Sequence, residues 1–413
     1  MVNKKDIKIL QELASRVREL ADLPIQEEKQ TLWRKLNSLK PERPMVMIDQ
    51  ICWNEMNIND ELTLQCTDPE CRMYEDNLRR ILYQWKYFPV DMVVEPFIKV
   101  NKAISGYLDF GVGIIENTET LDPTNSVVSH KYINQFEKEE DLNKIKCPHI
   151  IYDQKETQRR ITVAHEIFDG FLNIKLWGAG PYASLWDPIS MWMGVENALY
   201  SLIDKPDFMH KLVRKLTECY INMFLQLEEQ GLLCEPQELI HCTGAYTYEL
   251  PKSNYNPDKP RLKDIWVMGM AQMFSTVSPK MFKEFEIDYV SQIYRYFGLG
   301  YYGCCEPLDG MMKEVRMIPN VRKISMSPWV KKERGASEIG QDFVYSCKPN
   351  PAFVATTTFD ENHIRKDLEE TKNLCAKYGC PLEIILKDIS TVRYQPERLF
   401  KWGKIAMEVV NSQ

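Results

Sequence analysis

The sequence predicts an α/β fold, a TIM-type (β/α)8 barrel preceded by an N-terminal helical extension. Short apolar runs alternate with helical patterns along most of the 413 residues, and this alternation is typical of a parallel sheet. About eight strands can be counted, the number that closes such a barrel. Because no internal repeat or long linker interrupts the pattern, we expect a helical extension over 1–70 and one barrel over 71–413.

Composition and charge exclude several classes of protein. The 44% of hydrophobic residues suffice for a sizeable core, and the net charge of −7 provides no basic field for nucleic acid. No apolar run is long enough to span a bilayer, and the first residues lack the apolar core of a signal peptide. Twelve irregularly spaced cysteines without an export signal indicate free thiols in a cytoplasmic protein.

The first expected element is a pair of amphipathic helices over residues 5–40. Ile7, Leu10, Ala14 and Val17 recur at helical spacing, and Pro24 interrupts the pattern. We expect these helices to cap the fold or to form a dimer arm, and the sequence leaves open whether the protein is a homodimer.

The remaining elements follow from runs of β-branched and aromatic residues, and from apolar residues at helical spacing between turn signals. The expected strands cover residues 45–51, 92–100, 174–177, 239–242, 267–270, 299–302, 321–325, 343–346 and 381–386. The expected helices cover residues 75–85, 188–202, 206–230, 278–297, 311–317, 335–340, 360–378 and 396–410.

The most informative stretch is 298–310, GLGYYGCCEPLDG, where a strand ends in reactive residues. Strand alternation predicts that Tyr302, Cys304 and Glu306 face one way and Cys305 the other. A thiolate and a carboxylate on one face can share a metal ion or a proton. The alternative is a buried, inert cysteine beside a surface glutamate.

Other polar residues stand at the ends of other expected strands, where barrel enzymes place their chemistry. Lys387 and Asp388 follow the last strand, and each can contact a polar substrate group or pair with the other. Tyr302, His241 and Trp329 are candidates for substrate contacts, and structural roles are the alternative for His241 and Trp329. Cys347 ends another strand and is a candidate ligand or a buried core residue.

Several segments together resemble the uroporphyrinogen decarboxylase superfamily, which includes corrinoid-dependent methyltransferases. They are 278–285 (SPKMFKEF), the strand that holds Cys304, 318–321 (IPNV), the strand at Phe343, 204–210 (DKPDFMH), and 383–388 followed by 395–399 (QPERL). The resemblance covers roughly residues 160–410 and implies the barrel fold. It does not fix the reaction, because one fold hosts several chemistries.

The resemblance also implies a ligand set for zinc, from a His-x-Cys pair and a later cysteine. Tyr302 occupies the place of the histidine, Cys304 matches the first cysteine and Cys347 lies near the place of the second. Because the histidine is missing, Glu306 is the expected additional ligand, with His241 and Glu249 as alternatives.

The favoured hypothesis is a methyltransferase of the O-demethylase type. It would move a methyl group from a methoxylated or methylated small molecule to a separate corrinoid protein. Zinc held by Cys304, Glu306 and Cys347 would act as Lewis acid, and Asp388 would protonate the leaving group. The chain lacks Asp-x-His-x-x-Gly, the pattern associated with cobalamin-binding domains, so the cobalamin must belong to the partner.

Two alternatives remain open. A metal-independent decarboxylase or lyase would use acidic residues for proton delivery, and cationic residues such as Arg322, Lys323 or Lys387 to hold a substrate carboxylate. A barrel used only for binding is the third hypothesis. It ranks last because polar residues gather at so many strand ends.

Overall fold

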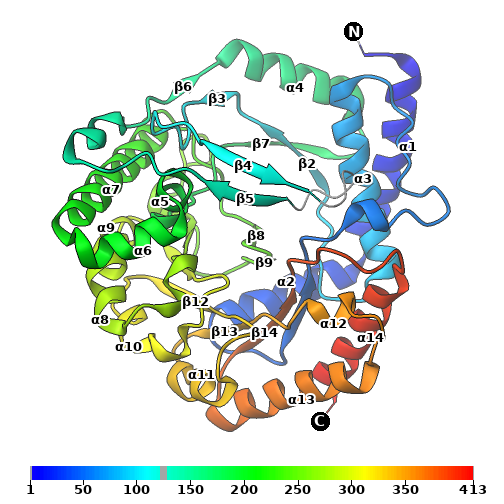
Figure 1. Ribbon diagram of the computed structural model, residues 1–413. Coiled ribbons are helices and arrows are strands. Elements are labelled where there is room, and N and C mark those ends of the chain that lie inside the picture. Colours follow the sequence, from blue (N-terminus) through cyan, green and yellow to red (C-terminus); the bar gives the residue numbers. More distant parts are fainter. Residues whose placement is uncertain (1, 121–127, 413) are drawn as a thin grey trace.

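The computed structural model describes residues 2–120 and 128–412, and it has an α/β architecture with strands inside and helices outside (Figure 1). The central sheet is parallel and six-stranded, in the order β1–β14–β13–β12–β11–β10. The bounds are β1 Met45–Ile48, β10 Trp266–Gly269, β11 Leu299–Tyr302, β12 Val321–Met326, β13 Val344–Cys347 and β14 Leu382–Leu386.

Two further parallel strands, β2 (Phe97–Asn101) and β7 (Asn173–Trp177), pair with each other and not with the central sheet. Single contacts connect the two sheets. The Asp91 amide, which precedes β2, donates to the Val46 carbonyl at 2.9 Å, and Tyr182, which follows β7, forms an isolated parallel bridge with Met268. In the described residues the ladder therefore does not close a continuous barrel.

Proline and glycine lie at the ends of this isolated pair of strands. Pro96 directly precedes β2, and the segment 178–181 (GAGP) directly follows β7. Because proline has no amide hydrogen, it cannot donate to a neighbouring strand, and glycine weakens a strand further. The predicted closed ring of eight strands is thus observed only as a six-stranded parallel sheet and a separate parallel pair.

Fourteen α-helices are present in the described residues, and most cover the outside of the strands (Figure 1). The longer ones are α1 Lys4–Ala21, α2 Pro24–Asn37, α3 Pro69–Tyr87, α4 Gln154–Phe168, α5 Trp186–Met193, α6 Val195–Asp204, α7 Pro206–Glu229, α11 Lys332–Ile339, α13 Glu361–Tyr378 and α14 Glu397–Asn411. The shorter ones are α8 Pro279–Phe282, α9 Asp288–Tyr294, α10 Met312–Val315 and α12 Ala352–Ala355.

Local sequence explains two differences from the expected helices. The single helix predicted over 188–202 is two helices, α5 and α6, because Gly194 adopts φ +75° between them. Helix α3 begins earlier than predicted. The Asp68 side chain accepts from the amides of Glu70 and Cys71, and Pro69 occupies the first helical turn.

Three antiparallel pairs lie outside the parallel sheets. They are β3 (Ile104–Ser105) with β6 (Ile151–Tyr152), β4 (Glu116–Glu119) with β5 (Ser129–Tyr132), and β8 (Leu239–Ile240) with β9 (Thr243–Gly244). The strand predicted over 239–242 is therefore wrong in part. His241 and Cys242 form the turn of the β8–β9 hairpin, with φ of 38° and 69°. This left-handed backbone ends the strand after Ile240.

Helix α2 covers the end of the central strands where the strands begin, whereas α1 packs against α3 and α4. Trp33 of α2 is buried and donates through Nε1 to the Asp91 carbonyl at 2.9 Å. Asn37, also on α2, donates to the carbonyls of Gly244 and Tyr246 at 3.0 and 2.7 Å. The expected boundary at residue 70 does not separate the sheet from the extension, because β1 lies before it and pairs with β14.

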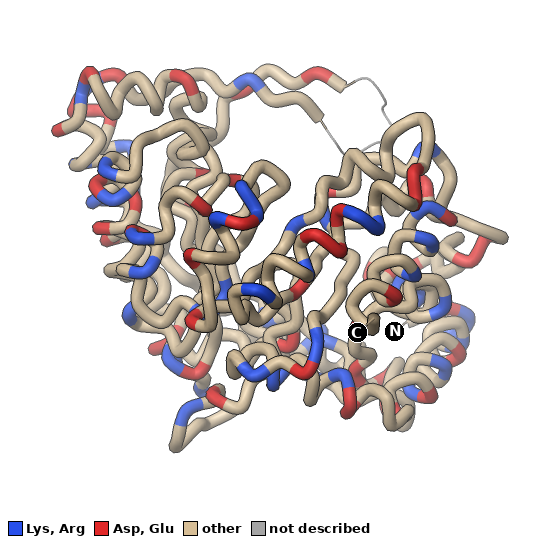
Figure 2. The backbone as a smooth tube through the Cα atoms, turned by 90° about the horizontal axis from the view of Figure 1, so that it is seen from below, with Lys and Arg blue, Asp and Glu red and all other residues tan. Residues whose placement is uncertain are grey.

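Charges of both signs are interspersed along the chain (Figure 2). Across residues 2–120 and 128–412, none of the helices is long and apolar enough to cross a membrane.

The β8–β9 hairpin lies directly against α2, and Gly244 makes this contact possible. A Cβ atom at position 244 would lie 2.4 Å from Trp33 Cδ2, well inside van der Waals contact. We predict that Gly244→Ala lowers the free energy of unfolding by about 1–3 kcal/mol through overpacking. Urea denaturation monitored by circular dichroism would measure this change.

Gly113→Ala is the matched control, because no atom lies within 4 Å of a Cβ built at Gly113. Its effect should stay within about 0.5 kcal/mol. Equal effects of the two substitutions would contradict the close packing of the hairpin on α2.

Candidate active site

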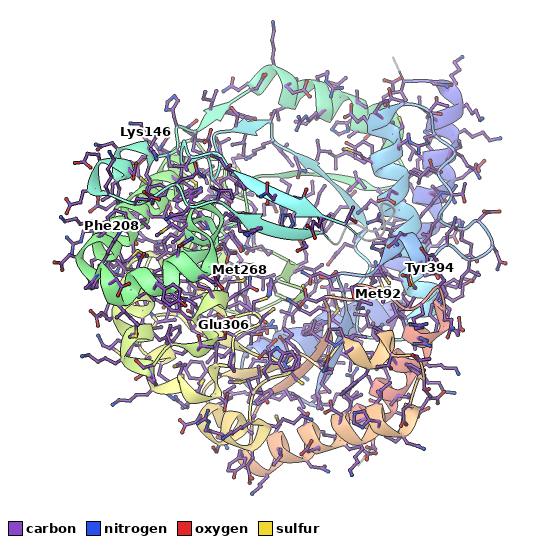
Figure 3. The ribbon with its side chains drawn as sticks, in the orientation of Figure 1. Met92, Lys146, Phe208, Met268, Glu306 and Tyr394 are labelled. Atoms are coloured by element: carbon purple, nitrogen blue, oxygen red, sulfur yellow. The ribbon has the colours of Figure 1, made fainter. Side chains whose placement is uncertain are left out.

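The candidate site lies where β11, β13 and β14 end. Cys304, Cys305 and Glu306 follow β11, and Lys387 and Asp388 follow β14. Gly303 ends β11 with φ +92°, and a Cβ there would lie 2.5 Å from Leu308 Cδ1, so glycine is required. The turn at Gly303 ends the strand alternation, and it brings Cys304 toward the residues that follow β14. Glu306 lies in the interior of the ring of helices (Figure 3).

A thiol and an ammonium group form the centre of the site. Lys387 Nζ lies 3.1 Å from Cys304 Sγ, and both side chains are buried. Lys387 Nζ also lies 3.2 Å from Asp388 Oδ2 and 3.4 Å from His241 Nε2. The ammonium group therefore contacts three side chains, and with Lys387 these four residues come from three separate segments of the sequence.

The thiol of Cys304 is strongly acidic in this environment. The hydrogen bond from Cys305, whose Sγ lies at 3.5 Å, lowers the pKa of Cys304, and His241 and Lys387 lower it further. Burial raises the pKa but does not outweigh these contacts. The same hydrogen bond raises the pKa of Cys305, because Cys305 holds the proton that it donates to Cys304. Cys304 is thus the thiolate of the pair.

Glu306 holds the backbone of this loop and carries a proton near neutral pH. Its two oxygens accept from the amides of Ala271 and Cys304 at 2.9 and 3.0 Å. Burial raises the pKa of Glu306 to about 7, although these amides oppose the shift. A carboxyl group with such a pKa can exchange protons at physiological pH.

His241 reaches the site from the turn of the β8–β9 hairpin. Its ring packs edge-on against Tyr301, with ring centroids 5.2 Å apart. Burial lowers the pKa of His241, so the ring is neutral near pH 7 and can accept a hydrogen bond. The turn places His241 at the site although β8 itself runs antiparallel to β9.

A buried polar network below the site holds the hairpin in place. Lys323 of β12 pairs with Glu383 of β14 at 2.7 Å, and both side chains have no exposed surface. Lys323 also donates to the Gly244 carbonyl at 2.8 Å, and Thr243 donates to Glu383 at 2.7 Å. Burial lowers the pKa of Lys323 to about 8, although the negative charge of Glu383 acts in the opposite direction and raises it.

Lys348 extends this network toward the site. Its Nζ donates to Ser346 Oγ at 2.6 Å, and Ser346 donates to Glu383 at 2.6 Å. Lys348 Nζ also lies 5.3 Å from the centre of the Tyr301 ring. Among the described residues, the buried lysines are Lys323, Lys348 and Lys387, and Lys323 pairs directly with Glu383.

Other predicted site residues lie elsewhere. Tyr302 faces the outer helices, where its hydroxyl donates to Glu286 at 2.9 Å, so it does not share a face with Cys304 as predicted. Cys347 lies on the face of β13 opposite Ser346, where Lys332 and Asp367 of the helix layer influence its pKa. Trp329 is 70% exposed.

Glu249 and Arg322, which the sequence offered as an alternative zinc ligand and an alternative substrate-binding cation, lie outside the candidate site. Glu249 and Arg322 form an ion pair, and Arg322 donates to the carbonyl of Asn37 on α2. They therefore lie where the strands begin, at the opposite end from Cys304.

The predicted zinc ligands are not gathered around one point. Cys347 faces the helix layer, and both oxygens of Glu306 accept backbone hydrogen bonds. The Lys387 ammonium already neutralises the Cys304 thiolate on one side. Within the described residues, no three His, Cys, Asp or Glu side chains are placed to hold a metal ion. The set of Cys304, Glu306 and Cys347 therefore does not fit zinc as arranged.

Sequence reasoning missed Tyr182 and Asp187. The Tyr182 hydroxyl donates to Asp187, and burial raises the pKa of Asp187. The charges of Cys304 and His241 also influence this pKa, so Asp187 lies close to the site. The signal was present in the sequence, because both residues follow β7, and the carboxyl ends of parallel strands are where functional residues gather.

The comparisons with known proteins define only the class of fold. No family model matches the chain, and no curated protein matches it. A solved structure, a methyltransferase from Methanosarcina mazei, matches with a TM-score of 0.52 and 12% identity over 92% of this chain and 98% of that chain. The protein thus shares its α/β fold with that methyltransferase almost end to end. The resemblance to the uroporphyrinogen decarboxylase superfamily stays a prediction.

The contact between Lys387 and Cys304 yields a testable titration. We predict that the thiolate of Cys304, measured as the absorbance at 240 nm lost in Cys304→Ser, persists well below pH 9. Lys387→Met removes a positive charge beside the sulfur, so the pKa should rise by about 1–3 and the thiolate should appear at higher pH.

Lys377→Met is the control, because Lys377 is exposed and pairs with Glu333 on the outer helices. Identical titration curves for wild type and Lys387→Met would show that the ammonium does not stabilise the thiolate.

The buried pair of Lys323 and Glu383 yields a stability prediction. Glu383→Gln would leave the Lys323 ammonium buried without a counter-charge. We expect the free energy of unfolding to fall by about 3–5 kcal/mol. In the exposed pair of Glu333 and Lys377, Glu333→Gln should cost under about 1 kcal/mol. Urea midpoints would compare the two, and equal shifts would contradict a structural role for the buried pair.

Proposed function

We propose that this protein is a methyltransferase that takes a methyl group from a methylated or methoxylated small molecule and passes it to a separate corrinoid protein. The observation that carries the proposal is the Cys304 thiolate beside Lys387 where parallel strands end. The fold shared with a methyltransferase supports the same class of reaction. The corrinoid partner and a cytoplasmic location are predictions from the sequence.

Each residue of the site has a role in this proposal. Cys304 presents the negative charge that faces the methyl group, and Lys387 and His241 keep this sulfur ionised. Asp388 is half exposed beside Cys305, with 4.0 Å between its Oδ2 and Cys305 Sγ. It supplies the proton when the leaving group is an alkoxide. Glu306 fixes the loop through two backbone amides.

Zinc stays a prediction from the family resemblance. A bound zinc ion would supply Lewis-acid activation of the leaving oxygen or sulfur. The predicted ligands do not converge, so the roles above are assigned to the chain's own side chains. Elemental analysis of wild type beside Cys304→Ala and Glu306→Ala tests this prediction separately from the reaction.

A second candidate is a decarboxylase or lyase on the same fold. The observation in its favour is the group of buried ammonium groups, because Lys348 and Lys387 can both bind a substrate carboxylate. The other cations predicted from the sequence are less suitable for binding a substrate carboxylate. Lys323 is paired with Glu383, and Arg322 lies at the opposite end of the strands.

The assay uses reduced cobalamin as a free acceptor and a panel of methylated and methoxylated small molecules. We expect at least one donor to convert reduced cobalamin to methylcobalamin, followed by absorbance. Cys304→Ala should lower the rate by about 100-fold or more, because it removes the charged group at the reacting centre. Cys147→Ala, at an exposed cysteine, is the control and should retain the wild-type rate.

Two results would contradict the proposal. A rate unchanged in Cys304→Ala would remove this site from the reaction. Carbon dioxide release from carboxylate substrates, without methylcobalamin from any donor, would favour the decarboxylase.

A further inference from the structure

A cavity near the candidate site was not identified from the sequence. It has a volume of about 270 Å³ and lies between the loop after β3 and the first turns of α5. This volume suits a small molecule. The lining residues are Leu108, Asp109, Phe110, Val112, Ile114, Tyr182, Asp187, Pro188, Met191, Trp192 and Tyr220.

Aromatic rings form much of the wall of this cavity. Phe110 contacts both Trp192 and Tyr220, with ring centroids 6.1 and 4.9 Å apart, and Tyr182 adds a fourth aromatic side chain. Phe110, Trp192 and Tyr220 are buried, so their positions are fixed by packing. The faces of such rings attract cations, most strongly where water is excluded.

The charged groups of the lining have one sign. Asp109 and Asp187 contribute carboxyl groups, and the lining residues include no Lys, Arg or His. Asp109 is exposed and accepts from the Gly111 amide at 3.0 Å, whereas Asp187 is partly buried and accepts from Tyr182. Carboxyl groups combined with aromatic walls select a cation with apolar substituents over an anion or a neutral polar molecule.

The cavity is connected to the candidate site through Tyr182 and Asp187. Tyr182 pairs with Met268 of β10, and Met268 pairs in turn with Tyr301 of β11. Asp187 lines the cavity, and the charges of Cys304 and His241 influence its pKa, so this carboxyl group lies near the thiolate. A molecule in the cavity is therefore close to the candidate site on the side of Asp187.

We propose that this cavity binds a methylated cation, a quaternary ammonium or sulfonium compound, as the methyl donor of the reaction. The inference rests on the proposed function, because it names the substrate class of that methyl transfer. In the step itself, the bond from the methyl carbon to nitrogen or sulfur breaks, and its electron pair stays on the leaving atom. The donor becomes a neutral amine or thioether, and the methyl group goes to the nucleophilic acceptor.

This donor class fits the site in a second respect. A methoxy donor leaves as an alkoxide and needs a proton or a Lewis acid. A cationic donor leaves as a neutral molecule and needs neither. The predicted zinc ligands do not converge beside Cys304, which suits a donor that carries its own activating charge.

The test compares the binding of choline with that of its neutral isostere, in which a tert-butyl group replaces the trimethylammonium group. Isothermal titration calorimetry on the full chain without acceptor would measure both affinities. We expect choline to bind about 10-fold or more tightly than the isostere, because shape is equal and only the charge differs. Equal affinities, or no binding of choline, would overturn the proposal.

Variants locate the binding to this cavity. Asp187→Asn keeps the shape of the side chain and should weaken choline binding by about 10-fold, and Phe110→Leu should do so without any change in charge. Asp207→Asn is the control, because Asp207 lines a separate surface cleft against α9. Wild-type affinity in both cavity variants, with circular dichroism spectra unchanged, would assign the cation to another site.

The outcome separates this inference from the proposed function. Choline binding that depends on Asp187, without methylcobalamin formation from any donor, would retain the cation cavity and reject the methyltransferase. Methyl transfer from methoxylated donors alone, without cation binding, would retain the methyltransferase and reject the cationic donor.

Discussion

The ion pair between Lys323 and Glu383 is the interaction on which the interior of this protein depends. Neither side chain has exposed surface, and each is bonded to the β8–β9 hairpin as well as to its partner. Two buried charges are tolerated only where hydrogen bonds satisfy their remaining donors and acceptors. Thr243, Gly244 and Ser346 supply those bonds, so the charged pair and the hairpin require each other.

The site above this pair is assembled from segments far apart in the sequence. The hairpin contributes His241, the turn after β11 contributes Cys304, and the end of β14 contributes Lys387. A thiolate beside an ammonium is nearly neutral as a unit, and burial strengthens the attraction between the two charges. In the proposed cation cavity, the carboxyl groups of Asp109 and Asp187 favour a ligand of positive charge.

The sequence was sufficient to predict the alternation of strands and helices and the cluster after β11. It was insufficient where side-chain direction depends on a single backbone turn. Alternation placed Tyr302 with Cys304, but the left-handed conformation of Gly303 ends the strand between them. His241 and Cys242 were assigned to a strand because they follow an apolar pair, whereas tertiary contacts bend them into a turn. The face of Cys347 depends on the register of β13, which no local pattern specifies.

The contact of α2 with the hairpin has a consequence for access to the site. Trp33 packs against Gly244 at the end of the interior where the strands begin, and Cys304 and Lys387 lie at the other end. In the proposed methyl transfer, the donor and the acceptor would therefore both approach from the end where the strands finish, and they would compete for the same approach.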